Sequence, residues 1–353
     1  MKINLNGSRR RFLLGVSASA LAATFTAKLG MSRALAADGA TLTVVSYGGA
    51  YQDAQAKAFF NPFAAAHGGV VIKQDSPTSN AKLKAMVEAG NVTWDIVLVD
   101  DSFGLDADAS WLEPIDYTVI DKASFLPGYA GTYRIGADVE ATVLAYRADK
   151  FPTDGPNSFA DFFDTAKFPG KRGAWKFAPG GIFEAALIAD GVPVDKLYPL
   201  DVDRALKKLT TIKDSLVWWE TGAQGDQLLA SGEVSMELLW IARALHSGET
   251  APVKIGWGQW TTQNGFWVVP KGTKNKTLAM EALKYFASEK AQIDFTKYMA
   301  YGPTNKNAVG KEDPRYKANL PTSHLDTKIT IDSAWWNTNQ AAVDAKFQEW
   351  LLQ

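Results

Sequence analysis

The pattern of hydrophobic and polar positions over residues 41–99 predicts alternating strands and helices. A β-branched run at 41–46 predicts a strand, the glycine pair at 48–49 ends it, and a helical pattern follows over 50–63. A second strand is expected at 70–73, then a helix capped by Ser79 or Asn80 that ends at Gly90. The near-continuous apolar run at 94–99 is typical of a strand buried on both faces of a sheet. This β-α-β-α-β order predicts an α/β domain.

The rest of the chain carries a second series of the same kind. Residues 141–146 are expected to form a strand that leaves the first domain, and 266–270 a strand closed by proline. Between them the pattern predicts helices at 158–164, 181–190 and 203–213, a helix ending at 232, and strands at 174–177 and 234–239. The longest helical pattern runs over 277–298, and a final one over 332–352. The sequence thus predicts a second α/β domain, with the chain returning afterwards to the first.

Composition fits a two-domain globular protein. The chain has 353 residues, of which 46% are apolar and 21% charged. Six of its 37 basic residues and none of its 38 acidic residues lie in the first 36 positions, so the remainder has 31 basic and 38 acidic residues and a formal charge of -7. An acidic protein is a poor partner for nucleic acid or anionic lipid. No apolar run after the N-terminal segment approaches the roughly 20 residues that a bilayer requires.

The N-terminus has the organisation of an export signal. Residues 8–13 (SRRRFL) resemble the twin-arginine motif, a weakly apolar stretch follows over 13–29, and 34–36 (ALA) supply a small-x-small cleavage pattern. We therefore expect residues 1–36 to be a twin-arginine signal peptide that is cleaved near Ala36, and the mature protein to be periplasmic.

The sequence offers no recognised catalytic or metal-binding constellation. It has no cysteine, no adjacent pair of tyrosines, and no phosphate loop, nucleophile elbow or H-E-x-x-H motif. Its three histidines, His67, His246 and His324, are isolated. The acids at 100–101 and 106–108 are interpreted as loop acids rather than a hydrolytic pair or metal site. We predict no catalytic residue, no metal ligand and no cofactor.

Several ordered segments carry a resemblance to a known family. They are 44–51 (VVSYGGAY), 94–97 (WDIV) with 100–102 (DDS), 158–162 (SFADF) through 168–171 (FPGK), 229–234 (LASGEV) with Trp240, 270–276 with 282–287, and 301–305 (YGPTN). In this order and spacing the chain resembles the periplasmic solute-binding proteins of the polyamine type, within the larger group that also handles ferric iron, thiamine and small organic ions.

The resemblance implies a fold and partners. The expected fold is the type II periplasmic binding protein, with two α/β lobes joined by hinge strands and a ligand cleft between them. Lobe 1 would comprise 38–141 plus 266–306, and lobe 2 would comprise 145–262 plus 308–353. The implied partners are the permease and ATPase subunits of an ABC importer, and the protein is expected to be a monomer.

The resemblance also suggests where ligand would bind. Tyr47 and Trp240 follow strands at the carboxyl ends, where α/β proteins bind ligands, and aromatic faces suit ammonium groups and methylene chains. The same comparison gives the full set of candidate ligand-binding residues: Tyr47, Gly48, Asp101, Ser102, Glu140, Phe177, Trp240, Asn264 and Tyr301.

Two acids expected of a polyamine binder are absent, because the chain has Phe177 and Asn264 in those regions. Asp101 and Glu140 are the candidate replacements, although each can equally be a solvated acid. Fewer acids favour a ligand with one ammonium, or a zwitterion whose carboxylate meets the free N–H groups after Gly48 or the side chain of Arg243. A surface role for Arg243 stays open.

The predicted function is the substrate-binding component of an ABC importer for a small amine, meaning a polyamine or a related compound such as an ω-amino acid. The alternatives within transport are a thiamine-like organic cation or ferric iron, and an enzyme is less favoured than either.

Overall fold

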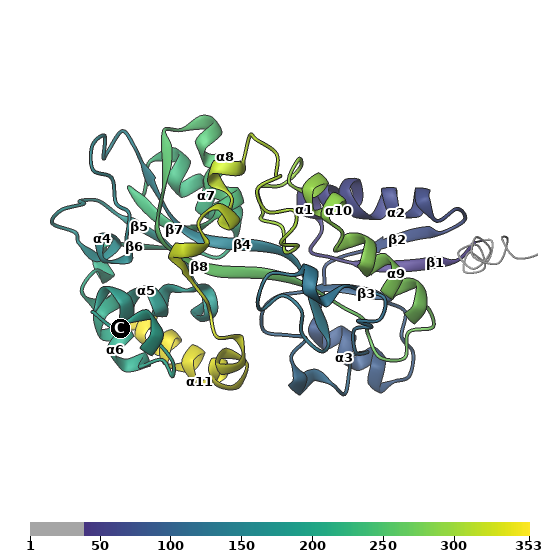
Figure 1. Cartoon of the computed structure of the whole chain (residues 1–353). Helices are drawn as coiled ribbons and strands as arrows, with labels where there is room; N and C mark the ends of the chain where they lie inside the picture. Colours follow the sequence, from purple (N-terminus) through teal and green to yellow (C-terminus); the bar gives the residue numbers. More distant parts are fainter. Residues whose placement is uncertain (1–38) are drawn as a thin grey trace, which may run out of the picture.

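Two long strands run through the middle of the molecule and join its two halves (Figure 1). They are β4 (Arg134–Arg147) and β8 (Val253–Val268), and they pair antiparallel from Arg134 opposite Val268 to Arg147 opposite Val253. The computed structural model describes residues 39–353, so the predicted signal peptide lies outside the described residues. Within that range, the strands form one nine-stranded sheet in the order β2-β1-β3-β8-β4-β7-β5-β6, with β9 (Lys328–Ile329) beside β8.

One half of the sheet is built from the first part of the chain. Its strands β1, β2 and β3 are parallel to one another, and β3 pairs antiparallel with β8. The elements of this half are β1 (Thr41–Val45), α1 (Gly49–Gln55), α2 (Asn61–Ala66), β2 (Val71–Asp75), α3 (Asn80–Glu88), β3 (Ile96–Val99), α9 (Lys276–Phe286) and α10 (Glu289–Phe295). The chain therefore returns to this half after β8, as the sequence predicts.

The other half gathers at the opposite ends of β4 and β8 (Figure 1). There β7 pairs antiparallel with β4, and β5 lies parallel to both β6 and β7. The elements are α4 (Phe159–Phe163), β5 (Arg172–Trp175), α5 (Ile182–Ala189), α6 (Val202–Thr210), β6 (Leu216–Trp219), α7 (Gly222–Ser231), β7 (Met236–Trp240), α8 (Ile241–Thr250) and α11 (Ser333–Leu352).

The α/β alternation predicted from the sequence is confirmed, and two helical regions differ in detail. The helix expected over 50–63 contains a π-helical turn, Ala56–Phe60, immediately before Pro62. Proline has no N–H and its ring crowds the carbonyl four residues earlier, which explains the wider turn. The single helix expected over 277–298 is two helices, α9 and α10, because the Ser288 side chain accepts a hydrogen bond from the Ala291 N–H and starts a new helix.

Two packed cores lie along the sheet. One contains β1, β3 and the buried rings of Phe59, Phe60, Trp267 and Phe286, and it extends through the central strands to part of α7 and α8. The second gathers apolar side chains from α4, α5, α6 and α11. The residue limits given above for the two lobes stay a prediction. No helix within residues 39–353 has the length and hydrophobicity of a membrane span.

Glu237 on β7 is an unusual member of the interior. Its side chain is fully buried, and neither carboxyl oxygen has a hydrogen-bond partner within residues 39–353. Burial, reinforced by the charge of Asp226, raises the pKa of Glu237 well above the ordinary value of 4.5. The folded chain therefore holds a proton here that the unfolded chain loses as the pH rises above 4.5, so this residue makes folding progressively less favourable over that range.

We predict that Glu237→Gln removes this penalty. The variant should have a higher melting temperature than the wild-type protein at pH 8, and the difference should vanish near pH 4. A difference of one unit between the pKa of Glu237 in the folded and in the unfolded chain corresponds to about 1.4 kcal/mol of folding free energy. Thermal unfolding of both proteins at the two pH values measures this, and an equal difference at pH 4 and pH 8 would contradict it.

Candidate ligand-binding cleft

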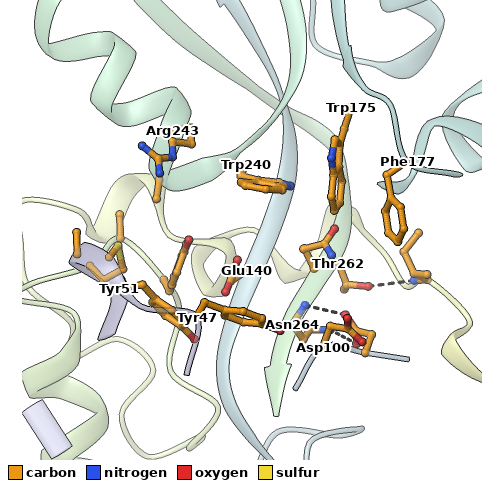
Figure 2. A pocket seen from close by; sticks show the side chains of 18 of the residues that line it. Tyr47, Tyr51, Asp100, Glu140, Trp175, Phe177, Trp240, Arg243, Thr262 and Asn264 are labelled. Atoms are coloured by element: carbon orange, nitrogen blue, oxygen red, sulfur yellow. Dashed lines mark hydrogen bonds between the residues drawn. The ribbon is translucent and has the colours of Figure 1, made fainter. Parts of the chain in front are cut away.

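A cavity of about 840 Å³ lies where the two halves face each other across β4 and β8 (Figure 2). Its lining comes from the segments after β1, β3 and β5, from α8 and the start of α11, from β4 and β8, and from the loop after α10. All nine residues predicted from the sequence line it: Tyr47, Gly48, Asp101, Ser102, Glu140, Phe177, Trp240, Asn264 and Tyr301. That they bind ligand stays a prediction.

The position of the cleft follows from the strand directions. Tyr47 lies two residues beyond β1, Asp100 directly beyond β3, Phe177 two residues beyond β5, and Trp240 is the last residue of β7. Carboxyl ends of strands are the edge at which open α/β sheets bind ligands. Both halves present this edge to the same cavity.

Aromatic rings form two opposite sides of the cleft (Figure 2). On one side Trp240 meets Trp175 edge-to-face with ring centroids 4.9 Å apart, and Phe177 lies 4.5 Å from Trp175. On the other side Tyr47 stacks on Tyr51 at 6.1 Å. Such faces can enclose a methylene chain and attract an ammonium group through cation–π interaction.

Asp101 is held by its neighbours rather than solvated. Its carboxylate accepts hydrogen bonds from the backbone N–H of Asn264 (2.7 Å) and from Asn264 Nδ2 (2.9 Å). Burial raises the pKa of Asp101 to about 6, although these two hydrogen bonds and the charge of Arg134 oppose the increase. Asp101 therefore ties the loop after β3 to the central strand β8.

A second pair of acids lies on β4. Asp138 is fully buried and accepts hydrogen bonds from the Tyr51 hydroxyl and, at 3.3 Å, from the Gly265 N–H. Glu140, two residues further along, is partly exposed and lines the cavity. Burial raises the pKa of Asp138 to about 6, and burial together with the charge of Asp138 raises the pKa of Glu140 well above 4.5.

Arg243 supplies a positive charge on the cleft wall (Figure 2). Its side chain forms no salt bridge with any residue of the described range 39–353. It belongs to the first turn of α8, which begins directly after Trp240 with no side-chain cap. Tyr301 belongs to the other half of the molecule. Burial raises the pKa of this tyrosine, and the positive charge of Arg243 partly counteracts that increase. An anion at this position would meet a guanidinium and the positive end of a helix.

Sequence reasoning missed several parts of the cleft. Trp175 packs beside Trp240 on one aromatic side, and Trp336 of α11 also lines the cavity. The Tyr51 hydroxyl donates a hydrogen bond to Asp138, the acid next to Glu140. Tyr51 lies within the segment 44–51 that carries the family resemblance, and Trp175 lies within the strand predicted at 174–177, so both carried a signal. Nothing in the sequence indicated that the start of α11 reaches the cleft. In the part of the chain that the structure describes, no group of three or more acidic or histidine side chains has the arrangement of a metal site.

Comparison with known proteins identifies the family. The family described as "Bacterial extracellular solute-binding protein" matches residues 58–322. The chain belongs to this family. It is 34% identical over 332 residues to a "Gamma-aminobutyric acid-binding protein" of Pseudomonas aeruginosa. The aligned region covers 91% of this chain and 94% of the relative.

Solved structures of binding proteins are also similar to this chain. A structure described as a GABA receptor is 39% identical, with a TM-score of 0.82, over 88% of this chain and 97% of the other. A binding protein from A. tumefaciens R10 in complex with agropinic acid is 35% identical, with a TM-score of 0.73, over 89% and 99% of the two chains.

These relationships establish the general role of this solute-binding protein. It is the substrate-binding component of an ABC transporter and not an enzyme. Proteins of this class bind small molecules and work with permease and ATPase subunits, so the predicted class of function and the type II periplasmic binding protein fold are confirmed.

We predict that Asp101→Ala destabilises the protein by about 2 kcal/mol, because it leaves two hydrogen-bond donors of the buried Asn264 without their acceptor. Chemical denaturation measures the change. Asp53→Ala is the matched control, since Asp53 is exposed on α1, and should alter stability by less than about 0.5 kcal/mol. Equal effects of the two variants would contradict a structural role for Asp101.

Proposed function

We propose that this receptor binds a small amino compound with one ammonium and one carboxylate, namely an ω-amino acid such as γ-aminobutyrate, for import. The observation that carries the proposal is that an acidic and a basic side chain line the same cleft. Glu140 and Arg243 line the same cavity, and the aromatic side chains of Tyr47 and Trp240 flank the space between them (Figure 2).

The ammonium group is assigned to the Glu140 end. Glu140 lies on the central strand β4, and Tyr301 lines the same cavity from the loop after α10. A charge-assisted hydrogen bond to a partly buried carboxylate is stronger than one between neutral groups. The ring of Tyr47 adds a face for the cation and the adjacent methylene groups.

The carboxylate is assigned to the Arg243 end. A guanidinium can hold a carboxylate with two parallel hydrogen bonds, and Arg243 forms no salt bridge with any acid of residues 39–353. The uncapped start of α8 adds backbone N–H groups and the favourable end of the helix dipole.

The same charges disfavour a polyamine. A diamine of similar length would bring its second ammonium against Arg243, and the acids expected of polyamine binders are replaced by Phe177 and Asn264. The relatives named for γ-aminobutyrate support the zwitterionic ligand among the amines considered from the sequence.

Delivery would follow the mechanics of the type II fold. The lobes 38–141 plus 266–306 and 145–262 plus 308–353 would close over the ligand by bending at the central strands, because the ligand contacts both and so favours the closed state. The cavity of about 840 Å³ is larger than a four-carbon amino acid, which fits an open state. Export of the folded protein to the periplasm by the twin-arginine signal at 1–36 completes the proposal.

A thermal-shift panel on the mature chain from Ala37 tests the ligand class. The panel contains γ-aminobutyrate, putrescine, spermidine, choline, thiamine and ferric citrate. A ligand at 100 times its dissociation constant stabilises the folded state by about 2.7 kcal/mol, which we expect for γ-aminobutyrate. Stabilisation by putrescine or spermidine but not by γ-aminobutyrate would overturn the proposal.

We predict that Arg243→Ala weakens γ-aminobutyrate binding at least about tenfold, because a charge-assisted hydrogen bond is lost. Binding of n-butylamine, which has no carboxylate, should change less than about threefold, so the variant separates the two ends of the ligand. Isothermal titration calorimetry measures both. Arg204→Ala, whose arginine pairs with Asp190 outside the cleft, is the matched control. Equal losses for both ligands would remove the carboxylate role from Arg243.

We also predict that Trp240→Ala weakens γ-aminobutyrate binding at least about tenfold while the protein stays folded, because its ring covers the ligand from lobe 2. Titration and the melting temperature are measured on the same preparation. An unchanged affinity would exclude Trp240 from the binding site.

A further inference from the structure

Asp138 and Glu140 form a contact that the binding role of the cleft does not by itself require. They lie two residues apart on β4, so their side chains project from the same face of the sheet, and their carboxyl groups are within hydrogen-bonding reach of each other. Neither takes part in any salt bridge formed by residues 39–353. Asp138 has no solvent exposure and does not itself line the cavity.

Two carboxyl groups in this arrangement cannot both be ionised in the empty cleft. Like charges at hydrogen-bonding distance repel strongly, and burial penalises each charge further. A single proton between the two groups relieves both costs, because the protonated group donates to the ionised one. Such a proton belongs to the pair rather than to either residue.

No cation within residues 39–353 forms a salt bridge with either carboxyl group and so takes the place of this proton. Tyr51 from α1 and Tyr301 from the loop after α10 contact the pair, and burial raises the pKa of both phenols well above 10, so they stay neutral. The charge of Arg134 acts on Asp101, and its Nη1 donates hydrogen bonds to the backbone oxygens of Asp101 and Phe103 rather than to the pair. The remaining titratable or charged groups around the cleft, within the described residues, are Tyr47, Asp100, Asp101, Tyr129, Arg243, His246, Glu249, Tyr298 and Tyr316.

We propose that Asp138 and Glu140 share one proton in the empty cleft and that an ammonium ligand competes with this proton for Glu140. Asp138 is then a positioning residue that links affinity to pH without contacting ligand. This inference rests on the proposed function for its ligand, but the shared proton can be tested without any ligand.

The pH dependence of γ-aminobutyrate binding tests the competition. Raising the pH from 6 to 8 should increase the association constant of the wild-type protein at least about fivefold. Release of one proton on binding limits this increase to about tenfold per pH unit. Calorimetry in two buffers of different ionisation enthalpy should show proton release on binding.

Asp138→Asn should abolish this pH dependence, leaving less than about a twofold change, because its amide group donates to Glu140 permanently and leaves no proton to displace. Asp100→Asn is the matched control: it removes an acid from the same cavity outside the pair, and the pH dependence should remain. If the pH dependence persists in Asp138→Asn, the proposal is wrong.

Infrared difference spectroscopy of the ligand-free proteins at pH 7 tests the shared proton directly. Asp138→Asn and Glu140→Gln should each lose the same protonated-carboxyl band, and the double variant should lose no more than either single variant. Additive losses, or no loss, would overturn the shared proton. If γ-aminobutyrate fails to bind the wild-type protein, the proposed function fails, and the infrared result still decides this inference.

Discussion

The antiparallel ladder between β4 and β8 joins the two halves of the chain and forms the floor of the cleft. Thirteen of the fourteen residues of β4 pair with residues of the sixteen-residue β8, so the strands span both halves. The register places Asp138 opposite Gly265 and Glu140 opposite Gln263, next to Asn264. The residues of the floor are thus fixed by backbone pairing, whereas the walls come from strand ends on either side.

This arrangement explains how an acidic floor is tolerated. Each of the three acids is buried or partly buried, and each is stabilised differently: Asp101 by Asn264, Asp138 by Tyr51 and Gly265, and Glu140 by its contact with Asp138 and Tyr301. Unpaired negative charge in such a place destabilises the fold unless a cation or a proton compensates it. In the proposed binding mode, a ligand ammonium beside Glu140 would recover part of this cost to stability.

Much of the architecture could be predicted from hydrophobic periodicity, and the limits have physical causes. β1, β3 and β7 are short and mainly apolar, and their predicted ends lie within one residue of the observed ends, whereas β5 ends at Trp175, two residues before its predicted end. The central strands were found only in part, at 141–146 and 266–270, because their floor-forming segments carry Glu140, Gln263 and Asn264 where a buried strand is expected to be apolar. Polar residues that line the cleft therefore hid the strands that carry them.

The residues of the candidate site could likewise be predicted from the sequence only in part. Tyr47 and Trp240 were found by their positions after predicted strands and Phe177 through the family resemblance, and all nine candidates line one cavity. Asp138 was missed because it is buried behind Glu140, and Trp336 because only tertiary packing brings α11 to the cleft. Which acids contact each other depends on side-chain geometry that no sequence pattern encodes.

The most direct test of this account is a crystal structure of the mature chain grown with γ-aminobutyrate. The account predicts a single ligand in the cleft, with its ammonium within about 3 Å of a Glu140 oxygen, its carboxylate on Arg243, and Tyr47 and Trp240 on either side. A ligand bound in the opposite orientation, or outside this cleft, would contradict it.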